Sequence, residues 1–162
     1  MENKVLSRYV DELATRVNGE VEESFGVLVL KVKAPFISET LIGAKNFPDV
    51  PCDFLHDLCG VDGGDHLEVV YQLSSLHGPQ LLRVKASMDR ENPVIDSATR
   101  IWEGANYLER EAYDMFGIKF KGHPNLKRIY MWDDFEGYPL RKDYVTEPIE
   151  VRNVVRTRIE GE

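Results

Sequence analysis

The amino-acid sequence predicts an α+β fold in two layers, in which helices cover one face of a mixed β-sheet, followed by an extended irregular C-terminal segment. Two stretches place apolar residues at helical spacing, five short runs have the composition of strands, and the chain after Gly117 shows neither pattern. A length of 162 residues, with 43% hydrophobic and 30% charged residues, suits one domain that buries a sizeable core.

Three segments are predicted to be helices: Glu2–Val17, Pro35–Ala44 and Ser97–Met115. The first carries an apolar stripe at helical spacing, and Asn18-Gly19 is a suitable stop. The second opens on proline, which suits the first turn of a helix. In the third, Ser97 can cap the helix, although Gly104 weakens it.

Five segments are predicted to be strands: Val21–Glu23, Val27–Lys33, Phe54–Val61, Leu67–Ser74 and Gln80–Ala86. They are rich in β-branched residues, and turn residues such as Gly63-Gly64 and Gly78-Pro79 separate the last three. The predicted order is α-β-β-α-β-β-β-α, and a mixed sheet with helices on one face buries these stripes.

The chain after Gly117 is dense in glycine, proline, aromatic and charged residues, so long regular elements are not expected there. We expect these aromatic side chains to be shielded from solvent, either by packing on the chain's own domain or by docking onto another chain. We therefore divide the protein into an α+β domain, residues 1–117, and a C-terminal docking segment, residues 118–162. Residues 147–162 are charged and mixed, and we expect them to order only on a partner.

Charge and composition exclude several functional classes. The net charge of −8 disfavours general binding to nucleic acid or to an anionic membrane surface. No apolar run approaches the roughly 18 residues of a membrane span, and the start lacks a signal-peptide core. With no export signal, Cys52 and Cys59 are expected to be reduced. We predict a cytoplasmic protein that serves any membrane process through protein partners.

One candidate metal site combines Cys52, His56 and Cys59 with His66 further along the chain. Two thiols and two imidazoles can complete a tetrahedral zinc shell. The spacing matches no common zinc pattern, and the predicted strand cannot project all of these side chains from one face. Ordinary buried cysteines and surface histidines are the favoured interpretation.

A second candidate is the acidic cluster Asp133, Asp134 and Glu136, ten residues beyond His123. These groups could hold Mg²⁺ or act as acid and base. No spaced ligand loop or phosphate-binding glycine motif supports this interpretation. Nearby basic residues favour a solvated or interfacial charge network instead: Lys119, Lys121, Lys127, Arg128, Arg141 and Lys142.

The third candidate is the charged end of the predicted third helix. Arg110 and Asp114 lie four residues apart, so we predict that they pair along the helix. With Glu109 and Glu111 they form either a solvated helix face or the polar ring of a protein–protein interface. No nucleophile elbow, Walker loop or dinucleotide fingerprint occurs, and two cysteines exclude a four-thiolate cluster within this chain.

Residues 109–128, EREAYDMFGIKFKGHPNLKR, closely resemble the signature of the 30 kDa (C) subunit family of complex I, the NADH–quinone oxidoreductase. Residues 133–145, DDFEGYPLRKDYV, resemble its continuation, and residues 55–62, LHDLCGVD, an upstream family segment. The sequence departs only modestly from the family pattern. Phe135 stands where the family usually has tryptophan, and Tyr107 where tryptophan is frequent. Cys59 stands in place of threonine or serine, and Val145 in place of proline.

The resemblance implies a scaffold role rather than a reaction in this chain. Family members sit in the peripheral arm on the cytoplasmic or matrix side. They contact the D subunit, which forms the quinone pocket, and the iron–sulfur subunits B and I. The complex passes electrons from NADH to quinone and exports protons. The flavin, iron–sulfur clusters and quinone are expected on partners, with no cofactor, metal or catalytic residue in this chain.

The resemblance also implies a docking surface along residues 109–144. Its expected partner-binding residues are Glu109, Arg110, Glu111, Tyr113, Asp114, Phe116, Gly117, His123, Pro124, Leu126, Arg128, Asp134, Glu136, Gly137, Pro139, Leu140, Arg141, Lys142, Asp143 and Tyr144. Three alternatives stay open. The chain could be the equivalent subunit of an energy-converting hydrogenase or of a ferredoxin- or F420-linked complex. It could be a free-standing metal-dependent enzyme, or an assembly factor that leaves before maturity.

Overall fold

A computed structural model describes residues 2–145 of the chain. The elements in chain order are α1 (Glu2–Val17), β1 (Glu20–Ser24), β2 (Val27–Lys33), a 3-10 turn (Ala34–Phe36), α2 (Ile37–Lys45), β3 (Phe54–Asp62), β4 (His66–Ser74), β5 (Leu81–Asp89), β6 (Val94–Asp96), α3 (Ala105–Phe116) and β7 (Lys119–Lys121). The predicted ordering of residues 147–162 lies outside the described residues.

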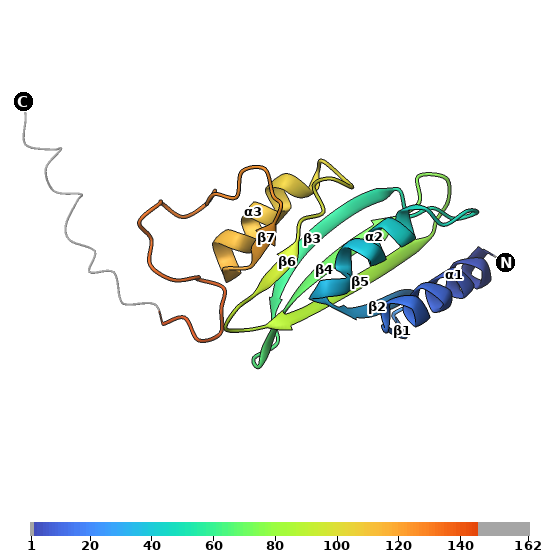
Figure 1. Ribbon diagram of the computed structural model, residues 1–162, viewed down its shortest axis with the longest axis horizontal. Coiled ribbons are helices and arrows are strands. Elements are labelled where there is room, and N and C mark those ends of the chain that lie inside the picture. The colour runs from blue at the N-terminus through green and yellow to red at the C-terminus, as the bar shows by residue number, and fades with distance from the viewer. Residues whose placement is uncertain (1, 146–162) are drawn as a thin grey trace, which may run out of the picture.

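The main sheet has five strands in the order β1-β2-β5-β4-β3. Strand β2 runs parallel to β5, whereas the other neighbouring strands are antiparallel, so the sheet is mixed as predicted. Helices α1 and α2 lie on one face of this sheet (Figure 1). The predicted α+β class with a helix-covered sheet is confirmed.

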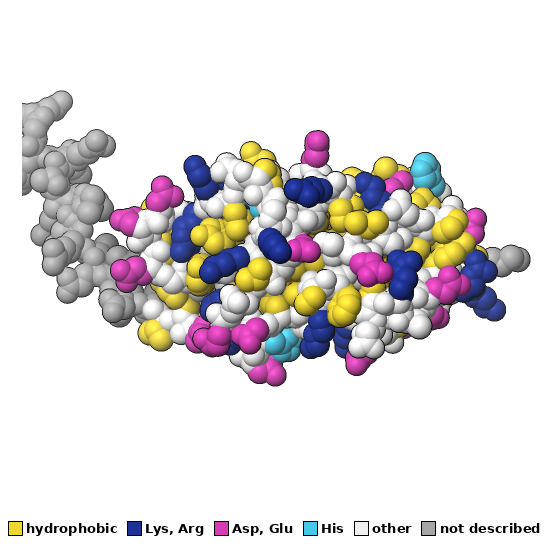
Figure 2. Space-filling view, in the orientation of Figure 1, with side chains coloured by type: hydrophobic (Ala, Val, Ile, Leu, Met, Phe, Trp, Pro, Cys, Tyr) yellow, Lys and Arg dark blue, Asp and Glu magenta, His cyan; other side chains and the backbone are white. Residues whose placement is uncertain are grey.

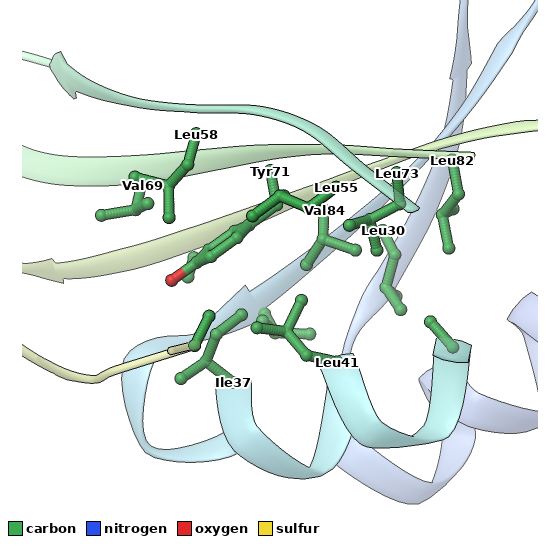
Figure 3. Close-up of a cluster of buried hydrophobic side chains, with 14 of the residues drawn as sticks. Leu30, Ile37, Leu41, Leu55, Leu58, Val69, Tyr71, Leu73, Leu82 and Val84 are labelled. Atoms are coloured by element: carbon green, nitrogen blue, oxygen red, sulfur yellow. The ribbon is translucent and has the colours of Figure 1, made fainter. Parts of the chain in front are cut away.

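The core lies between α1, α2 and the covered face of the sheet. Alternate residues of the central strands point into it, and Tyr71 and Val84 are fully buried there. Figure 3 shows Ile37 and Leu41 of α2 meeting these strand side chains. The strands and the helices therefore bury their apolar side chains against one another.

Two short strands escaped the sequence analysis. Strand β6 pairs in parallel with β7, joining Val94–Asp96 to Lys119–Lys121. Three residues are too few to show a period of two, which explains why the pattern gave no signal. Ile118 and Phe120 are buried with the core, so the core continues beyond Gly117.

The third helix begins later than predicted, at Ala105 rather than Ser97. The intervening residues form turns, in which the N–H groups of Ile101 and Trp102 both donate to the Ala98 carbonyl at 2.9 Å. The Ser97 hydroxyl does not cap a helix there, because it donates to Glu109 at 2.7 Å. A contact twelve residues along the chain thus replaces the local cap that the sequence suggested.

No helix in the part of the chain that the structure describes is both long and apolar enough to cross a membrane.

Candidate functional site

Helix α3 is the platform of the candidate site and packs against strand β3. Its inward face buries Ala105, Ala112 and Met115. A glycine on β3 permits the close approach, because a Cβ added to Gly60 would lie 2.5 Å from Cδ2 of Phe116. The helix ends at Gly117, whose φ of 75° is the left-handed conformation that favours glycine.

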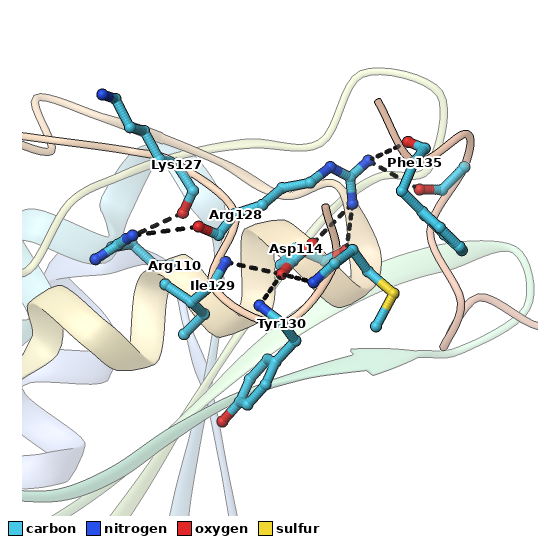
Figure 4. A network of polar contacts seen from close by, with 9 residues as sticks. Arg110, Asp114, Lys127, Arg128, Ile129, Tyr130 and Phe135 are labelled. Atoms are coloured by element: carbon cyan, nitrogen blue, oxygen red, sulfur yellow. Dashed lines mark hydrogen bonds and ion pairs between the residues drawn. The ribbon is translucent and has the colours of Figure 1, made fainter. Parts of the chain in front are cut away.

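After β7 the chain returns over α3 as an irregular segment, residues 122–145, which we call the C-terminal loop. Asp114 of α3 holds it in place. One carboxylate oxygen of Asp114 accepts the backbone N–H groups of Ile129, Tyr130 and Met131 at 2.9, 2.7 and 3.0 Å. Figure 4 shows this carboxylate beneath the loop. Three successive amides on one oxygen fix the path of the backbone.

Arg128 completes the anchor. Its guanidinium lies 2.7 Å from the other Asp114 oxygen and donates to the carbonyls of Phe135 and Gly137 at 3.1 and 3.0 Å. The Asp114 side chain is fully buried and that of Arg128 is 12% exposed. Burial raises the pKa of Asp114, but hydrogen bonds from Tyr130, Arg128 and the neighbouring amides outweigh it and leave the pKa lowered. The carboxylate is therefore ionised at neutral pH.

The predicted pair between Arg110 and Asp114 is wrong. Arg110 instead donates to the carbonyls of Lys127 and Arg128 at 3.0 and 3.2 Å. Asp114 pairs with Arg128, which comes from the returning chain. The rule for residues four apart describes an isolated helix, whereas here a second segment lies above the helix and offers better partners.

The far end of the loop is fastened at separate points on α3 and β3. Arg141 donates to the carbonyl of Phe116 at 2.6 Å. Asp62, at the end of β3, accepts the N–H of Lys142 at 2.8 Å and pairs with Arg90. Arg90 also pairs with Asp143 at 2.8 Å. Hydrogen bonding by Arg90 first, then by backbone N–H groups, lowers the pKa of Asp62.

Tyr138 fills the space above the end of α3. A Cβ on Gly117 would lie 2.5 Å from the Tyr138 ring, so only glycine fits beneath it. The guanidinium carbons of Arg128 and Arg141 lie 5.3 and 5.1 Å from the centre of the same ring. This tyrosine, together with Asp62 and Arg90, was missed as a site residue. For Asp62, the upstream family-like segment was the available signal.

Glu109 is buried rather than part of a solvated helix face. Its carboxyl accepts the Ser97 hydroxyl at 2.7 Å and the Ala98 N–H at 2.5 Å. Burial raises its pKa to about 7, and the two hydrogen bonds only partly oppose this. The fully buried Tyr71 has a raised pKa too, from burial first and then from Glu109 and Asp96. Glu109 thus ties the 97–104 turns to α3.

His123 is also tied within the chain. Its Nε2 lies 3.0 Å from the Asn106 carbonyl, and its Nδ1 accepts the N–H of Asn125 at 3.0 Å. The arrangement requires the tautomer that carries a proton on Nε2. This histidine shapes the start of the C-terminal loop.

The acidic cluster was predicted to form a solvated or interfacial charge network. No salt bridge among the described residues involves Asp133, Asp134 or Glu136, all of which are exposed. Arg128 and Arg141 turn to Asp114 and to backbone carbonyls instead. These three carboxylates therefore remain on the surface of the loop.

The cysteines and histidines of the candidate zinc site do not converge. Cys52 is buried, as predicted, but Cys59 is exposed, because edge strand β3 turns it to the open face. Burial raises the pKa of Cys52 to about 12. Within residues 2–145, no three His, Cys, Asp or Glu side chains are placed to hold a metal ion.

The twenty residues predicted to bind partners divide by exposure. Three are buried: Glu109, Asp114 and Gly117. Nine are half-buried: Arg110, Tyr113, Phe116, His123, Leu126, Arg128, Pro139, Arg141 and Tyr144. Eight are exposed: Glu111, Pro124, Asp134, Glu136, Gly137, Leu140, Lys142 and Asp143. Most of the buried and half-buried polar groups bind other parts of this chain.

The exposed face of the C-terminal loop carries large apolar side chains. Tyr130, Trp132 and Leu140 are 61%, 63% and 55% exposed. Trp132 meets Phe135 edge-on at 5.1 Å, which limits its motion. Figure 2 shows acidic, basic and apolar side chains interspersed on the viewed face. Rigid aromatics among charged groups are typical of protein-binding surfaces.

Comparisons with known proteins agree with this architecture. Residues 30–150 match the family described as "Respiratory-chain NADH dehydrogenase, 30 Kd subunit". The C 1 subunit of NADH-quinone oxidoreductase from Rhizobium meliloti (strain 1021) is 43% identical over 155 residues, or 91% of this chain and 75% of the relative. The C 2 subunit of the same strain is 43% identical over 122 residues, or 74% of this chain and 66% of the relative. The chain thus spans about two thirds to three quarters of these relatives.

Two solved structures share the fold. The trypsin-resistant fragment of Nqo5 has a TM-score of 0.66 and 30% identity, over 75% of this chain and 99% of that one. A chain of the membrane-bound sulfane sulfur reductase, an archaeal respiratory membrane complex, has a TM-score of 0.70 and 24% identity, over 86% of this chain and 85% of that one. The second likeness concerns the fold alone. The profile match, the relatives and the fold together show that this chain belongs to the 30 kDa subunit family of NADH-quinone oxidoreductase, whose bacterial members are called the C subunit.

Proposed function

We propose that this chain is a non-catalytic scaffold subunit of the peripheral arm of a proton-translocating NADH–quinone oxidoreductase. It binds the quinone-pocket (D) subunit and the adjacent iron–sulfur subunits B and I, on the cytoplasmic face of the membrane. The flavin, iron–sulfur clusters and quinone belong to other subunits of the complex. The family membership supports the assembly, and the exposed face of the C-terminal loop supports the docking role.

The observation that carries the proposal is the contrast between the two sides of the C-terminal loop. Its inner side satisfies the charges of Asp114 and Arg128 within the chain. Its outer side exposes Tyr130, Trp132 and Leu140. A loop that is held internally and presents apolar side chains on its outer side can bind with little loss of conformational entropy. Arg128 therefore shapes the docking surface rather than contacting the partner through its charge.

The docking surface is tested by the double variant Trp132→Ala/Leu140→Ala, introduced into the tagged chain in its native host. We expect recovery of the D, B and I subunits with the tag to fall, because central aromatic anchors each contribute about 2 kcal/mol or more to binding. The readout is the ratio of each of these subunits to the tagged chain by quantitative mass spectrometry.

The matched control is Ile42→Ala, which trims an apolar residue that is 51% exposed on α2, away from the loop. It should leave recovery unchanged. Circular dichroism of each purified chain checks that the variants fold. Normal recovery of the three partners with Trp132→Ala/Leu140→Ala would show that the loop is not the docking surface.

The same preparation identifies the electron donor, since the donor site is expected on another chain. A copurified flavin-binding NADH subunit supports the proposed assembly. A nickel-binding subunit in its place would assign the chain to an energy-converting hydrogenase. Metal analysis of the purified chain separately tests for a free-standing metal enzyme, which tight stoichiometric metal would indicate.

A further inference from the structure

A buried carboxyl group without a basic partner lies beneath the turns that precede α3. Glu109 is fully buried, and none of the ion pairs among the described residues includes it. Its two oxygens accept the Ser97 hydroxyl and the Ala98 N–H. Burying a carboxylate without a cation is costly, which favours the protonated, neutral form. A group in this position needs a route by which the proton arrives.

The titratable groups on the neighbouring elements supply no such route. Tyr71 of β4 is fully buried, and its pKa is raised by burial first and then by the charges of Glu109 and Asp96. Its hydroxyl has no hydrogen-bond partner among the described residues. Asp96 of β6 accepts the Ser38 hydroxyl at 3.0 Å, and Arg110 on α3 donates to the C-terminal loop. Further titratable residues on the elements around Glu109 are exposed: His56 and Asp57 on β3, Arg100 and Glu103 in the turns, and Lys119 and Lys121 on β7.

Two hydroxyl groups lead from Glu109 to the surface. Ser97 Oγ lies 2.7 Å from Oε2 of Glu109 and 2.7 Å from Oγ1 of Thr99. The Thr99 N–H also donates to Ser97 Oγ at 3.2 Å, which holds the serine hydroxyl between the two groups. Thr99 is half-buried and lines a surface pocket together with Glu103 and Tyr107. The two hydroxyls therefore join a buried carboxyl group to solvent.

This hydrogen-bonded row fits both protonation states of Glu109. A hydroxyl group donates one hydrogen bond and can accept two. With Glu109 ionised, Thr99 donates to Ser97, and Ser97 donates to the carboxylate. With Glu109 protonated, the carboxyl group donates to Ser97, and Ser97 donates to Thr99. The same positions of the oxygen atoms satisfy both arrangements, so binding a proton requires only that the hydroxyls reverse.

We propose that Glu109 is a proton-binding site that exchanges its proton with solvent through the hydroxyl groups of Ser97 and Thr99. On uptake, a hydronium ion gives a proton to Thr99 Oγ1 and becomes water. Thr99 passes its own proton to Ser97 Oγ, and Ser97 passes its own to Oε2 of Glu109. Three O–H bonds break and three form, and each hydroxyl keeps one proton. Release follows the same steps in reverse.

The site can change its protonation state near neutral pH. Burial raises the pKa of Glu109 to about 7, and the hydrogen bonds from Ser97 and Ala98 only partly oppose this. The inference goes beyond the proposed scaffold role, since it gives this chain a group that binds and releases a proton. It does not depend on which partner covers the C-terminal loop.

The test uses NMR of the purified full chain, isotopically labelled at the side-chain carboxyl groups of glutamate. The Glu109 signal, assigned by its loss in Glu109→Gln, should move between about pH 5 and 8 as one averaged signal, because exchange through the hydroxyls is fast. Thr99→Val removes the outer hydroxyl. Exchange should then slow by about 100-fold, and separate signals of the protonated and ionised forms should replace the averaged one.

Two matched variants separate the hydroxyl from other effects of the substitution. Thr99→Ser keeps the hydroxyl and should restore the averaged signal. Thr15→Val removes an exposed hydroxyl on α1, which donates to the Asp11 carbonyl, and should leave the Glu109 signal as in the wild-type chain. Amide spectra check that each variant folds. Ser97→Ala interrupts the row at its inner hydroxyl and serves as a second break if Thr99→Val does not fold.

The outcomes distinguish the route from the site. Separate signals in Thr99→Val or Ser97→Ala, with an averaged signal in Thr99→Ser, support the proposal. An averaged signal in every folded variant would show that the proton reaches Glu109 by another path, and would overturn the route. A Glu109 signal that does not move between about pH 5 and 8 would overturn the proton-binding site itself.

Discussion

At the scale of single residues, Asp114 determines the form of the candidate site. It is fully buried, yet ionised, because one arginine and three backbone N–H groups surround its two oxygens. An ion pair in such a place depends on every partner, since removing one leaves an uncompensated charge or unsatisfied donors. The residue fixes the backbone of a segment that has no regular secondary structure.

Asp114→Ala should therefore detach the C-terminal loop from α3. We expect the free energy of unfolding to fall by about 3–5 kcal/mol, because Arg128 and three amides lose their acceptor. Denaturant titration measures the loss, and limited proteolysis should locate new cleavage within residues 122–145. Asp114→Asn keeps one acceptor oxygen, so its free energy of unfolding should lie between those of the wild-type chain and Asp114→Ala. Wild-type stability of Asp114→Ala would contradict this account.

Glu109 gives the chain a dependence on pH near neutrality. Its pKa rises from 4.5 to about 7 on folding, so the folded state binds a proton that the unfolded state releases. The resulting stability is fully present below about pH 4.5 and is lost by about pH 7, and it amounts to about 3 kcal/mol. The glutamine side chain of Glu109→Gln cannot ionise, so the stability of this variant should not fall in this way as the pH rises.

The measurement compares denaturant titrations of the wild-type chain and Glu109→Gln between pH 5 and 8. The stability difference should shift in favour of the glutamine variant as pH rises, and should level off above about pH 7. A constant difference across this range would show that Glu109 does not titrate there.

At the scale of elements, the end of α3 decides where the chain turns back. Gly117 is needed for two reasons, its positive φ and the ring of Tyr138 directly above it. Gly104, at the start of the same helix, has neither restriction, since its φ is −60° and no atom lies within 4 Å of an added Cβ. A side chain is therefore excluded at Gly117 but can be accommodated at Gly104.

Gly117→Ala should lower the stability of the chain, because the alanine Cβ strains the backbone and displaces Tyr138. A cost of about 1–3 kcal/mol is expected from the conformation alone. Gly104→Ala should change stability by less than about 1 kcal/mol. Thermal unfolding of the two variants makes the comparison, and equal midpoints would contradict it.

The sequence predicted the sheet better than the candidate site, because strands show in local sequence patterns whereas the contacts of the site join residues far apart in the chain. The β-branched composition and the turn residues that predicted β4 are local properties, and Leu67, Val69 and Tyr71 of this strand are all fully buried. The partner of Asp114 is fourteen residues away and is brought near by a return that no periodicity encodes. Local rules therefore paired Arg110 with Asp114, and they placed Glu109 on a solvated helix face or in the polar ring of an interface, whereas Glu109 is buried.

At the scale of the whole molecule, the C-terminal loop behaves as part of the folded domain. Its internal anchors reach α3 through Asp114, β3 through Asp62 and the β5–β6 connection through Arg90. Hydrogen exchange of the free chain should show the amides of residues 129–131 protected by at least about 100-fold over an unstructured peptide. Unprotected amides in the free chain would mean that the loop orders only on its partner.

The hydrogen bonds of the C-terminal loop also limit how another chain can recognise it. Arg110 and Arg128 occupy the carbonyls of residues 127, 128, 135 and 137, and Asp114 occupies the amides of residues 129–131. Because these backbone groups are already hydrogen-bonded, a strand of another chain cannot pair with these residues to extend its sheet. Selectivity must then come from side-chain shape, so a compatible neighbour is distinguished by the cavities it offers to Tyr130, Trp132 and Leu140.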